Sequence, residues 1–269
     1  MNFISQILEE KRRSSTCALV PFITAGYPNM TMTLEALCAL DKQGADVIEL
    51  GIPYADALAD GPIIQKSSQV ALDQGVNIDQ VISLLDKVQY QIKAPIVIFT
   101  YYNPILVKGI DQFIEEIAMK GVKGLIVPDL PIEETDYLIY LCDKYDVELI
   151  LFIAPTSSRD RIKNILQRAP GCIYLVSSTG VTGVRYNVNN EIGSLSTYIK
   201  SNTSKLIMLG FGISSPDHVL KVSSWNIDAI VVGSAFVRIM SKDTEPSCII
   251  KSLVSFCQSM KSAIRPRLR

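Results

Sequence analysis

Histidine and tryptophan are nearly absent from this chain of 269 residues, and its six cysteines form no motif. The single histidine, His218, gives little support to a histidine-based mechanism or a histidine-rich metal site. The cysteines are scattered and include no CxxC pair, so a disulfide framework and a thiolate metal centre are both unsupported. We therefore expect six reduced thiols, several of them in the core.

Charge and hydropathy exclude further classes of protein. The chain has 26 lysine and arginine residues against 27 aspartate and glutamate residues, so it lacks the basic excess typical of nucleic-acid-binding proteins. No apolar run approaches the roughly 20 residues that a membrane-spanning helix needs. The N-terminal stretch MNFISQILEEKRRS is typical of a short amphipathic helix and not of a signal peptide. We expect a cytoplasmic protein, or one of the plastid stroma if it is organelle-encoded, that binds neither nucleic acid nor membrane.

Eight short apolar runs recur along the chain, each rich in valine, isoleucine and leucine with little polar alternation. This pattern is typical of parallel strands that are covered on both faces, and segments of helical character separate the runs. Eight strand–helix units with right-handed crossovers close most economically into a barrel. We therefore predict an α/β fold, a single (β/α)8 TIM barrel domain over residues 1–269 with a short N-terminal helix. The predicted strands are 17–23, 47–51, 95–100, 124–129, 148–155, 172–178, 205–212 and 229–235, and the predicted helices include 31–43, 111–120, 132–145, 159–168 and 217–222.

Two carboxylates mark the second predicted strand and the loop that follows it. Glu49 interrupts an apolar run, and a buried carboxylate is costly unless it is paired, protonated or at a wet strand end. In a TIM barrel the loops at the carboxyl ends of the strands build the active site, so Glu49 and Asp60 are candidates for catalysis. A structural ion pair is the alternative for Glu49. Asp56 competes with Asp60 for the second acidic role, and spacing alone does not separate the two.

Three glycine-containing turns follow the last three predicted strands, and we interpret them as a phosphate site. Glycine lets main-chain NH groups approach a ligand closely, and the NH groups at the start of a helix attract anions. Barrels often bind phosphate at this corner, although any α/β protein also needs glycines at tight turns. We expect no metal ion in the site. The candidate residues of the three turns are Thr182, Gly183, Gly212, Gly233 and Ser234.

Two other residues have open interpretations. Asp129, in the sequence VPDLP, either belongs to the site or caps a helix that starts near Pro131. Tyr174 alternates along its strand with Val176 and Ser178, so its ring either reaches the cavity or packs in the core.

The stretch IELGIPYADALADGP, residues 48–62, resembles the signature of the tryptophan synthase alpha chain family. Further landmarks of that family follow in the same order along the chain: PFITAGYP, TYYNPI, VPDLP, SSTGVTG with Arg185 two residues beyond it, and GFGIS. The chain departs from the family's usual pattern at Ala55 and Ala57, where the family has serine and proline, and this bears on the stiffness of the loop. The resemblance implies a lyase of tryptophan biosynthesis that cleaves indole-3-glycerol phosphate to indole and glyceraldehyde 3-phosphate.

The same resemblance implies roles for individual residues. Glu49 and Asp60 are expected to be the catalytic carboxylates: Glu49 acts as acid and base with a pKa raised toward neutrality, and Asp60 accepts the indole NH. Thr182 is similar to the residue that closes over the site and engages the aspartate of the second loop. An apolar slot for the indole ring is expected from residues at strand ends, namely Phe22, Phe99, Val127, Ile153 and Tyr174.

The resemblance also implies a partner. No cofactor is expected in this chain, because pyridoxal phosphate belongs to a tryptophan synthase beta chain with which it would form an alpha2beta2 heterotetramer. We expect the beta chain to contact the exposed loops 53–60 and 101–109, including Tyr101, Tyr102, Pro104 and Ile105. Two alternatives stay open, namely another phosphate-binding barrel such as an indole-glycerol-phosphate synthase or phosphoribosyl isomerase, and a catalytically silent partner barrel. Lys205 lies at the far end of its strand, a poor place for the catalytic lysine that such barrels usually use.

Overall fold

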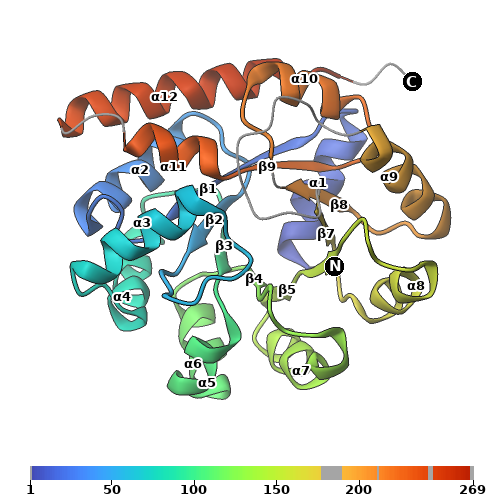
Figure 1. Ribbon diagram of the computed structural model, residues 1–269, viewed down its shortest axis with the longest axis horizontal. Coiled ribbons are helices and arrows are strands. Elements are labelled where there is room, and N and C mark those ends of the chain that lie inside the picture. Colours follow the sequence, from blue (N-terminus) through green and yellow to red (C-terminus); the bar gives the residue numbers. More distant parts are fainter. Residues whose placement is uncertain (1, 177–189, 211, 242–244, 267–269) are drawn as a thin grey trace.

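The computed structural model describes residues 2–176, 190–210, 212–241 and 245–266 (Figure 1). Its strands form one sheet in which every pair is parallel. The strands are β1 (Ala18–Thr24), β2 (Ile48–Gly51), β3 (Ile96–Phe99), β4 (Gly124–Ile126), β5 (Glu148–Leu149), β6 (Leu151–Ile153), β7 (Ile173–Val176), β8 (Ile207–Gly210) and β9 (Ala229–Val232).

Helices surround the strands on the outside of the sheet, as Figure 1 shows. Between most consecutive strands the chain leaves the sheet, forms one or two helices and returns in the same direction, which is the helical crossover that parallel strands require. The helices are α1 (Phe3–Arg13), α2 (Met30–Lys42), α3 (Pro62–Asp73), α4 (Ile78–Val88), α5 (Tyr102–Lys108), α6 (Ile110–Met119), η1 (Ile132–Glu134), α7 (Asp136–Lys144), α8 (Arg159–Arg168), α9 (Asn190–Asn202), α10 (Pro216–Ser223), α11 (Ser234–Met240) and α12 (Pro246–Ala263).

The sheet closes through its fifth strand. The strand order is β5-β4-β3-β2-β1-β9-β8-β7-β6, so the two ends of the sheet are β5 and β6. These two strands are consecutive in the chain and are separated only by Ile150, whose NH donates to the carbonyl of Leu125 at 2.9 Å. The predicted strand 148–155 is therefore one strand that pairs with β4 in its first half and with β7 in its second. The predicted TIM barrel is confirmed, with this one strand divided.

The register between strands decides which side chains meet inside the barrel. Phe22 of β1 pairs with Glu49 of β2, and Glu49 pairs in turn with Val97 of β3. Two positions further along, Gly51 pairs with Phe99. Because side chains alternate between the two faces of a strand, these residues share the face that points into the barrel.

Helix α1 closes the end of the barrel at which the strands begin, and it confirms the predicted N-terminal helix. Its residues Ile4 and Leu8 are completely buried. The buried carboxylate of Glu148 accepts hydrogen bonds from the main-chain NH of Ser5 at 2.9 Å, from its hydroxyl at 2.5 Å and from the NH of Cys172 at 2.7 Å. A β-carbon at Gly171 would overlap this carboxylate, so the glycine is what admits it.

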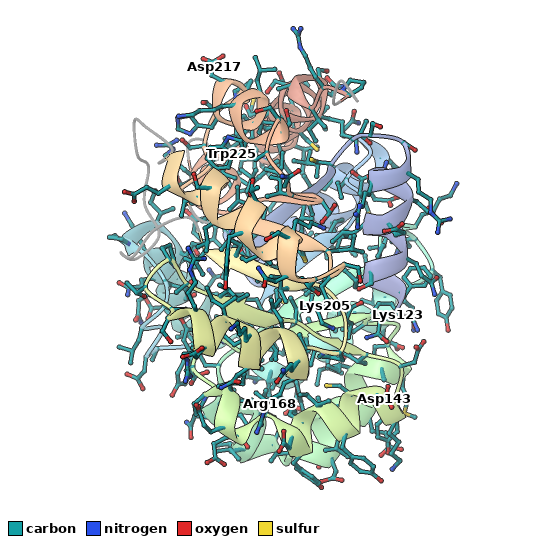
Figure 2. The ribbon with its side chains drawn as sticks, turned by 90° about the vertical axis from the view of Figure 1, so that its right-hand side faces the viewer. Lys123, Asp143, Arg168, Lys205, Asp217 and Trp225 are labelled. Atoms are coloured by element: carbon teal, nitrogen blue, oxygen red, sulfur yellow. The ribbon has the colours of Figure 1, made fainter. Side chains whose placement is uncertain are left out.

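One predicted helix is interrupted. The segment 132–145 forms the 3-10 helix η1 and then α7, with the break at Thr135. The hydroxyl of Thr135 donates to the carbonyl of Ile132 at 2.8 Å, and Arg168 of α8, labelled in Figure 2, donates to the same carbonyl at 3.0 Å. These side chains satisfy the carbonyl where the helical bonding is interrupted.

The sequence predicts reduced cysteines and no membrane-spanning helix. All six cysteines are free thiols, and four of them are buried. The predicted reduced thiols are therefore confirmed. Within the described parts of the chain, no helix combines the length and apolarity needed to span a bilayer.

Candidate active site

A cavity opens at the carboxyl ends of the strands, where the sequence predicts the site. It is narrow and partly open to solvent. Eight of the candidate residues line it, and Ile64 and Val231 line it as well. The cavity is formed by Phe22, Glu49, Asp60, Ile64, Phe99, Tyr174, Gly212, Val231, Gly233 and Ser234.

Glu49 faces this cavity with its side chain almost fully buried, at 2% exposure. Burial, reinforced by the nearby charge of Asp60, raises the pKa of Glu49 to about 8. Its Oε2 atom has no hydrogen-bond partner among the residues that the structure describes. Within the same residues Glu49 takes part in no ion pair, so the alternative of a structural salt bridge finds no support. At neutral pH the carboxyl group therefore carries a proton.

Asp60 is the second acidic group in the cavity, and the structure separates it from Asp56. Asp60 is 5% exposed, whereas Asp56 is exposed on the loop surface and does not line the cavity. Burial raises the pKa of Asp60 to about 6, and a hydrogen bond from Tyr101 opposes part of that rise. The side-chain amide of Gln65 in α3 fixes the loop, because it donates to the carbonyls of Ala57 and Asp60 at 3.2 and 2.9 Å.

Aromatic rings form the walls of the cavity. The rings of Phe22 and Phe99 meet edge to face with their centroids 5.9 Å apart. Tyr174 is buried, and burial followed by the nearby charge of Glu49 raises the pKa of its hydroxyl. A β-carbon at Gly210 would overlap the Tyr174 ring, so that ring lies directly on the main chain of β8. The structure thus places Tyr174 in the cavity, the first of the two interpretations that its strand allows.

The glycine corner lies in the same cavity as the carboxylates. Gly212 has φ +81°, a conformation that side chains other than glycine rarely adopt, and Gly233 precedes Ser234, the first residue of α11. Main-chain NH groups in the first turn of a helix have no acceptor within the helix and are available to an anion. Thr182 and Gly183 lie outside the described residues.

Asp129 and Ile153 do not line this cavity. Asp129 is exposed, and its carboxylate accepts the NH of Tyr102 at 2.9 Å, so it caps α5. The interpretation that Asp129 caps a helix after Pro131 is wrong, because its printed hydrogen bonds come from the NH of Tyr102 and not from η1. Ile153 is completely buried, and strand alternation turns it away from the face on which its neighbour Phe152 meets Tyr174.

The prediction that Tyr101 lies on the surface is wrong. It was expected on an exposed contact loop together with Ile105, but both side chains are buried, Tyr101 at 3% exposure. Tyr101 lies behind Asp60 and contacts its carboxylate. The sequence gives one weak signal, namely that Tyr101 follows β3 directly, where inward-facing residues of a barrel reach the site.

Across the described ranges, no three histidine, cysteine, aspartate or glutamate side chains come together as a metal site would require.

Comparison with known proteins decides the family. The model of a family described as the tryptophan synthase alpha chain matches residues 8–265. The chain belongs to the tryptophan synthase alpha chain family. The chain named tryptophan synthase alpha chain from Gracilaria tenuistipitata var. liui is 57% identical over 98% of this chain and 97% of its own length.

Solved structures agree with this membership. The tryptophan synthase alpha subunit of Legionella pneumophila is similar to the chain with a TM-score of 0.86 and 29% identity, covering 98% of each. A chain of the tryptophan synthase complex of Pyrococcus furiosus is similar with a TM-score of 0.83 and 30% identity, covering 91% of this chain and 98% of its own length. As a member of the tryptophan synthase alpha chain family, the chain is a lyase of tryptophan biosynthesis that acts on indole-3-glycerol phosphate. The matches do not favour the alternative barrel enzymes.

Proposed function

We propose that Glu49 and Asp60 catalyse the retro-aldol cleavage of indole-3-glycerol phosphate to indole and glyceraldehyde 3-phosphate. One observation carries this proposal, namely that two buried carboxyl groups with raised pKa values share a cavity with a glycine-rich corner. Pairs of acidic groups whose environments separate their pKa values are typical of acid–base catalysis, because one is protonated and the other ionised at the working pH.

Glu49 transfers protons on both sides of the carbon–carbon bond that breaks. Its carboxyl group protonates carbon 3 of the indole ring, which converts the ring into an indolenine with positive character at nitrogen. The resulting carboxylate takes the proton of the adjacent side-chain hydroxyl, and the carbon–carbon bond breaks to give the aldehyde and neutral indole. Glu49 ends the reaction protonated again. A pKa of about 8 suits both steps, because the protonated and the ionised forms of Glu49 differ little in free energy near neutral pH.

Asp60 stabilises the intermediate. Its pKa of about 6 leaves the carboxylate ionised at neutral pH, so that it accepts the NH of the indole ring as positive charge develops there. Because the site is buried, this interaction is stronger than it would be in water. The two carboxyl groups therefore have two separate roles.

The rest of the substrate is held by neutral groups. We assign the phosphate to the NH groups of Gly212, Gly233 and Ser234, with Thr182 and Gly183 as further members of the corner. We assign the indole ring to the part of the cavity that the aromatic side chains Phe22, Phe99 and Tyr174 line. Binding energy from the phosphate fixes the substrate in the reactive geometry. We leave Asp129 and Ile153 out of this site, since neither lines the cavity.

The substitution Glu49→Gln tests the assignment. It keeps the size of the side chain and removes its acid, so we expect indole release to fall by at least about a thousandfold, while glycerol phosphate still binds. Glu133→Gln, on the exposed turn η1, is the matched control and should behave as the wild type. Wild-type turnover in Glu49→Gln would disprove the acid–base role. Indole release by the chain alone also excludes the catalytically silent barrel.

Several further proposals follow from family membership. We propose that residues 1–269 fold as one domain and that the chain uses neither a cofactor nor a metal ion. A tryptophan synthase beta chain carrying pyridoxal phosphate is the proposed partner, in an alpha2beta2 heterotetramer, since a similar chain occurs in the Pyrococcus furiosus complex. The 57% identity to a red algal relative supports the plastid stroma as the compartment, with the cytoplasm as the second candidate.

A further inference from the structure

The hydroxyl of Tyr101 joins the side chain and the main chain of the catalytic loop. It donates to Asp60 Oδ2 at 3.1 Å, and it accepts the main-chain NH of Ala59 at 3.0 Å. Tyr101 is buried but does not line the cavity, so it lies on the side of Asp60 that is away from the substrate.

The Tyr101 hydroxyl acts as an acceptor toward Ala59 and as a donor toward Asp60. A main-chain NH can only donate, so the Tyr101 oxygen must act as its acceptor. The phenol has a single proton, and that proton is then directed at Asp60 Oδ2. A hydrogen bond to a charged carboxylate is stronger than one to a neutral carboxyl group, so the arrangement favours the ionised form of Asp60.

Aromatic packing keeps the hydroxyl in place. The Tyr101 ring lies against Tyr54 with the centroids 5.3 Å apart, and it meets Phe99 edge to face at 6.2 Å. A phenylalanine at position 101 would keep both ring contacts and lose only the hydroxyl.

We propose that Tyr101 is a positioning residue that keeps the Asp60 carboxylate ionised and turned toward the indole NH. This inference rests on the proposed catalytic role of Asp60. Tyr101 does not touch the reacting atoms and acts only through Asp60.

Other ionisable groups near Asp60 could also affect its protonation state. Glu49 of β2 and Tyr174 of β7 share the buried space with Asp60, and each is neutral when protonated. The charge of Asp129 reaches Tyr101 from the loop after β4. In the described part of the chain, Asp60 forms no ion pair with a lysine or arginine. Tyr101 is thus the hydrogen-bond donor that opposes the effect of burial on Asp60.

The test is the pH profile of kcat/KM for indole release by Tyr101→Phe. Without the hydroxyl, the pKa of Asp60 rises further, and activity is lost on the acid side at a higher pH. We expect the acid limb to move up by about one pH unit while the alkaline limb, which reports Glu49, stays in place. A purely structural role would lower the whole profile without moving the limb. That outcome would overturn the proposal.

Two controls separate this inference from the function on which it rests. Tyr137→Phe removes a hydrogen bond of the same kind, to Asp111 at 2.7 Å on the outer helices, and should leave the profile unchanged. If Asp60→Asn retains wild-type activity, the catalytic role of Asp60 is wrong. If Asp60→Asn is impaired and adding Tyr101→Phe reduces its rate as strongly as in the wild-type background, the positioning role alone is wrong, because the proposal predicts no further loss.

Discussion

The ring of Phe22 occupies the space in which a side chain at Gly51 would begin. A β-carbon at Gly51 would stand 2.6 Å from the ring's Cζ atom, closer than two carbon atoms can approach. Phe22 belongs to β1 and Gly51 to β2, and the ring forms one wall of the cavity. Gly51 therefore sets how far the ring withdraws from the space that we assign to indole.

We expect Gly51→Ala to displace the Phe22 ring into the cavity. The crowding should reduce the free energy of unfolding by about 1–3 kcal/mol, and the smaller slot should raise KM about tenfold. Steady-state kinetics and urea unfolding measure the two effects. In the double variant with Phe22→Leu the smaller side chain makes room, so the two substitutions should be less harmful together than their separate effects suggest. Wild-type KM in Gly51→Ala would contradict the proposed slot.

The buried carboxyl of Glu49 has a consequence for stability. Its pKa is about 8 in the folded chain, above the ordinary value of 4.5, so the folded state holds the proton more tightly than the unfolded state. The stability that this group contributes is fully present below about pH 4.5 and is lost as the pH rises through 8. Each unit of pKa difference corresponds to about 1.4 kcal/mol.

Glu49→Gln should therefore become more stable relative to the wild type as the pH rises, since glutamine has no proton to lose. We expect the difference in free energy of unfolding to grow by about 2–4 kcal/mol between pH 4.5 and pH 8. Urea unfolding at a series of pH values measures it, and any constant effect of the amide cancels from the comparison. A difference that does not change with pH would show that Glu49 titrates near its ordinary pKa.

The barrel could be predicted from the sequence because each strand has a local apolar pattern and this pattern recurs along the chain. Each apolar run is a strand, and the predicted helix 159–168 has the bounds of α8. The division of the fifth strand at Ile150 was not predicted, because it depends on which neighbour each half of the strand pairs with around the closed barrel. Local hydropathy contains no information about that closure.

The same distinction applies to the site. Glu49 was identified because a carboxylate in an apolar strand is conspicuous in the sequence. Asp60 and Asp56 were equal candidates by spacing, and only the family resemblance favoured Asp60. Tyr101 was assigned to the surface, since an aromatic residue after a strand gives no sign of its hydrogen bond to a residue 41 positions away. Glu148 lies in a predicted strand, and its sequence context gives no sign that two of the three donors to its carboxylate come from Ser5 in α1, beneath the barrel.

Glu148→Ala should strongly destabilise the fold. The substitution leaves the NH of Ser5 buried without its acceptor, leaves the NH of Cys172 with only the Ser5 hydroxyl at 3.0 Å, and detaches α1 from the barrel, which should cost about 3–5 kcal/mol. Ser5→Ala removes only the hydroxyl and should cost about 1–2 kcal/mol. Urea unfolding compares the two. Since Glu148 is remote from the cavity, KM for the folded fraction should not change. Equal stability of both variants would contradict the proposed role of Glu148 in holding α1 against the barrel.

The final prediction concerns the surface that we propose for the beta chain. Val107 of α5 is 81% exposed beside the mouth of the barrel, and Leu58 is equally exposed on the loop after β2. An aspartate at position 107 would bury an unpaired charge in such an interface, so Val107→Asp should weaken association with a tryptophan synthase beta chain at least about tenfold. Indole release by the isolated chain should not change.

Tyr90→Asp is the matched control for this substitution. Tyr90 is 88% exposed, but it precedes β3, whereas α5 follows β3, so the two side chains lie at opposite ends of the barrel. Titration calorimetry with the beta chain should give wild-type affinity for this variant. Equal affinity of both variants would exclude α5 from the interface. Weakening by Tyr90→Asp alone would place the partner at the end of the barrel that α1 closes, where it could not receive indole from the cavity directly.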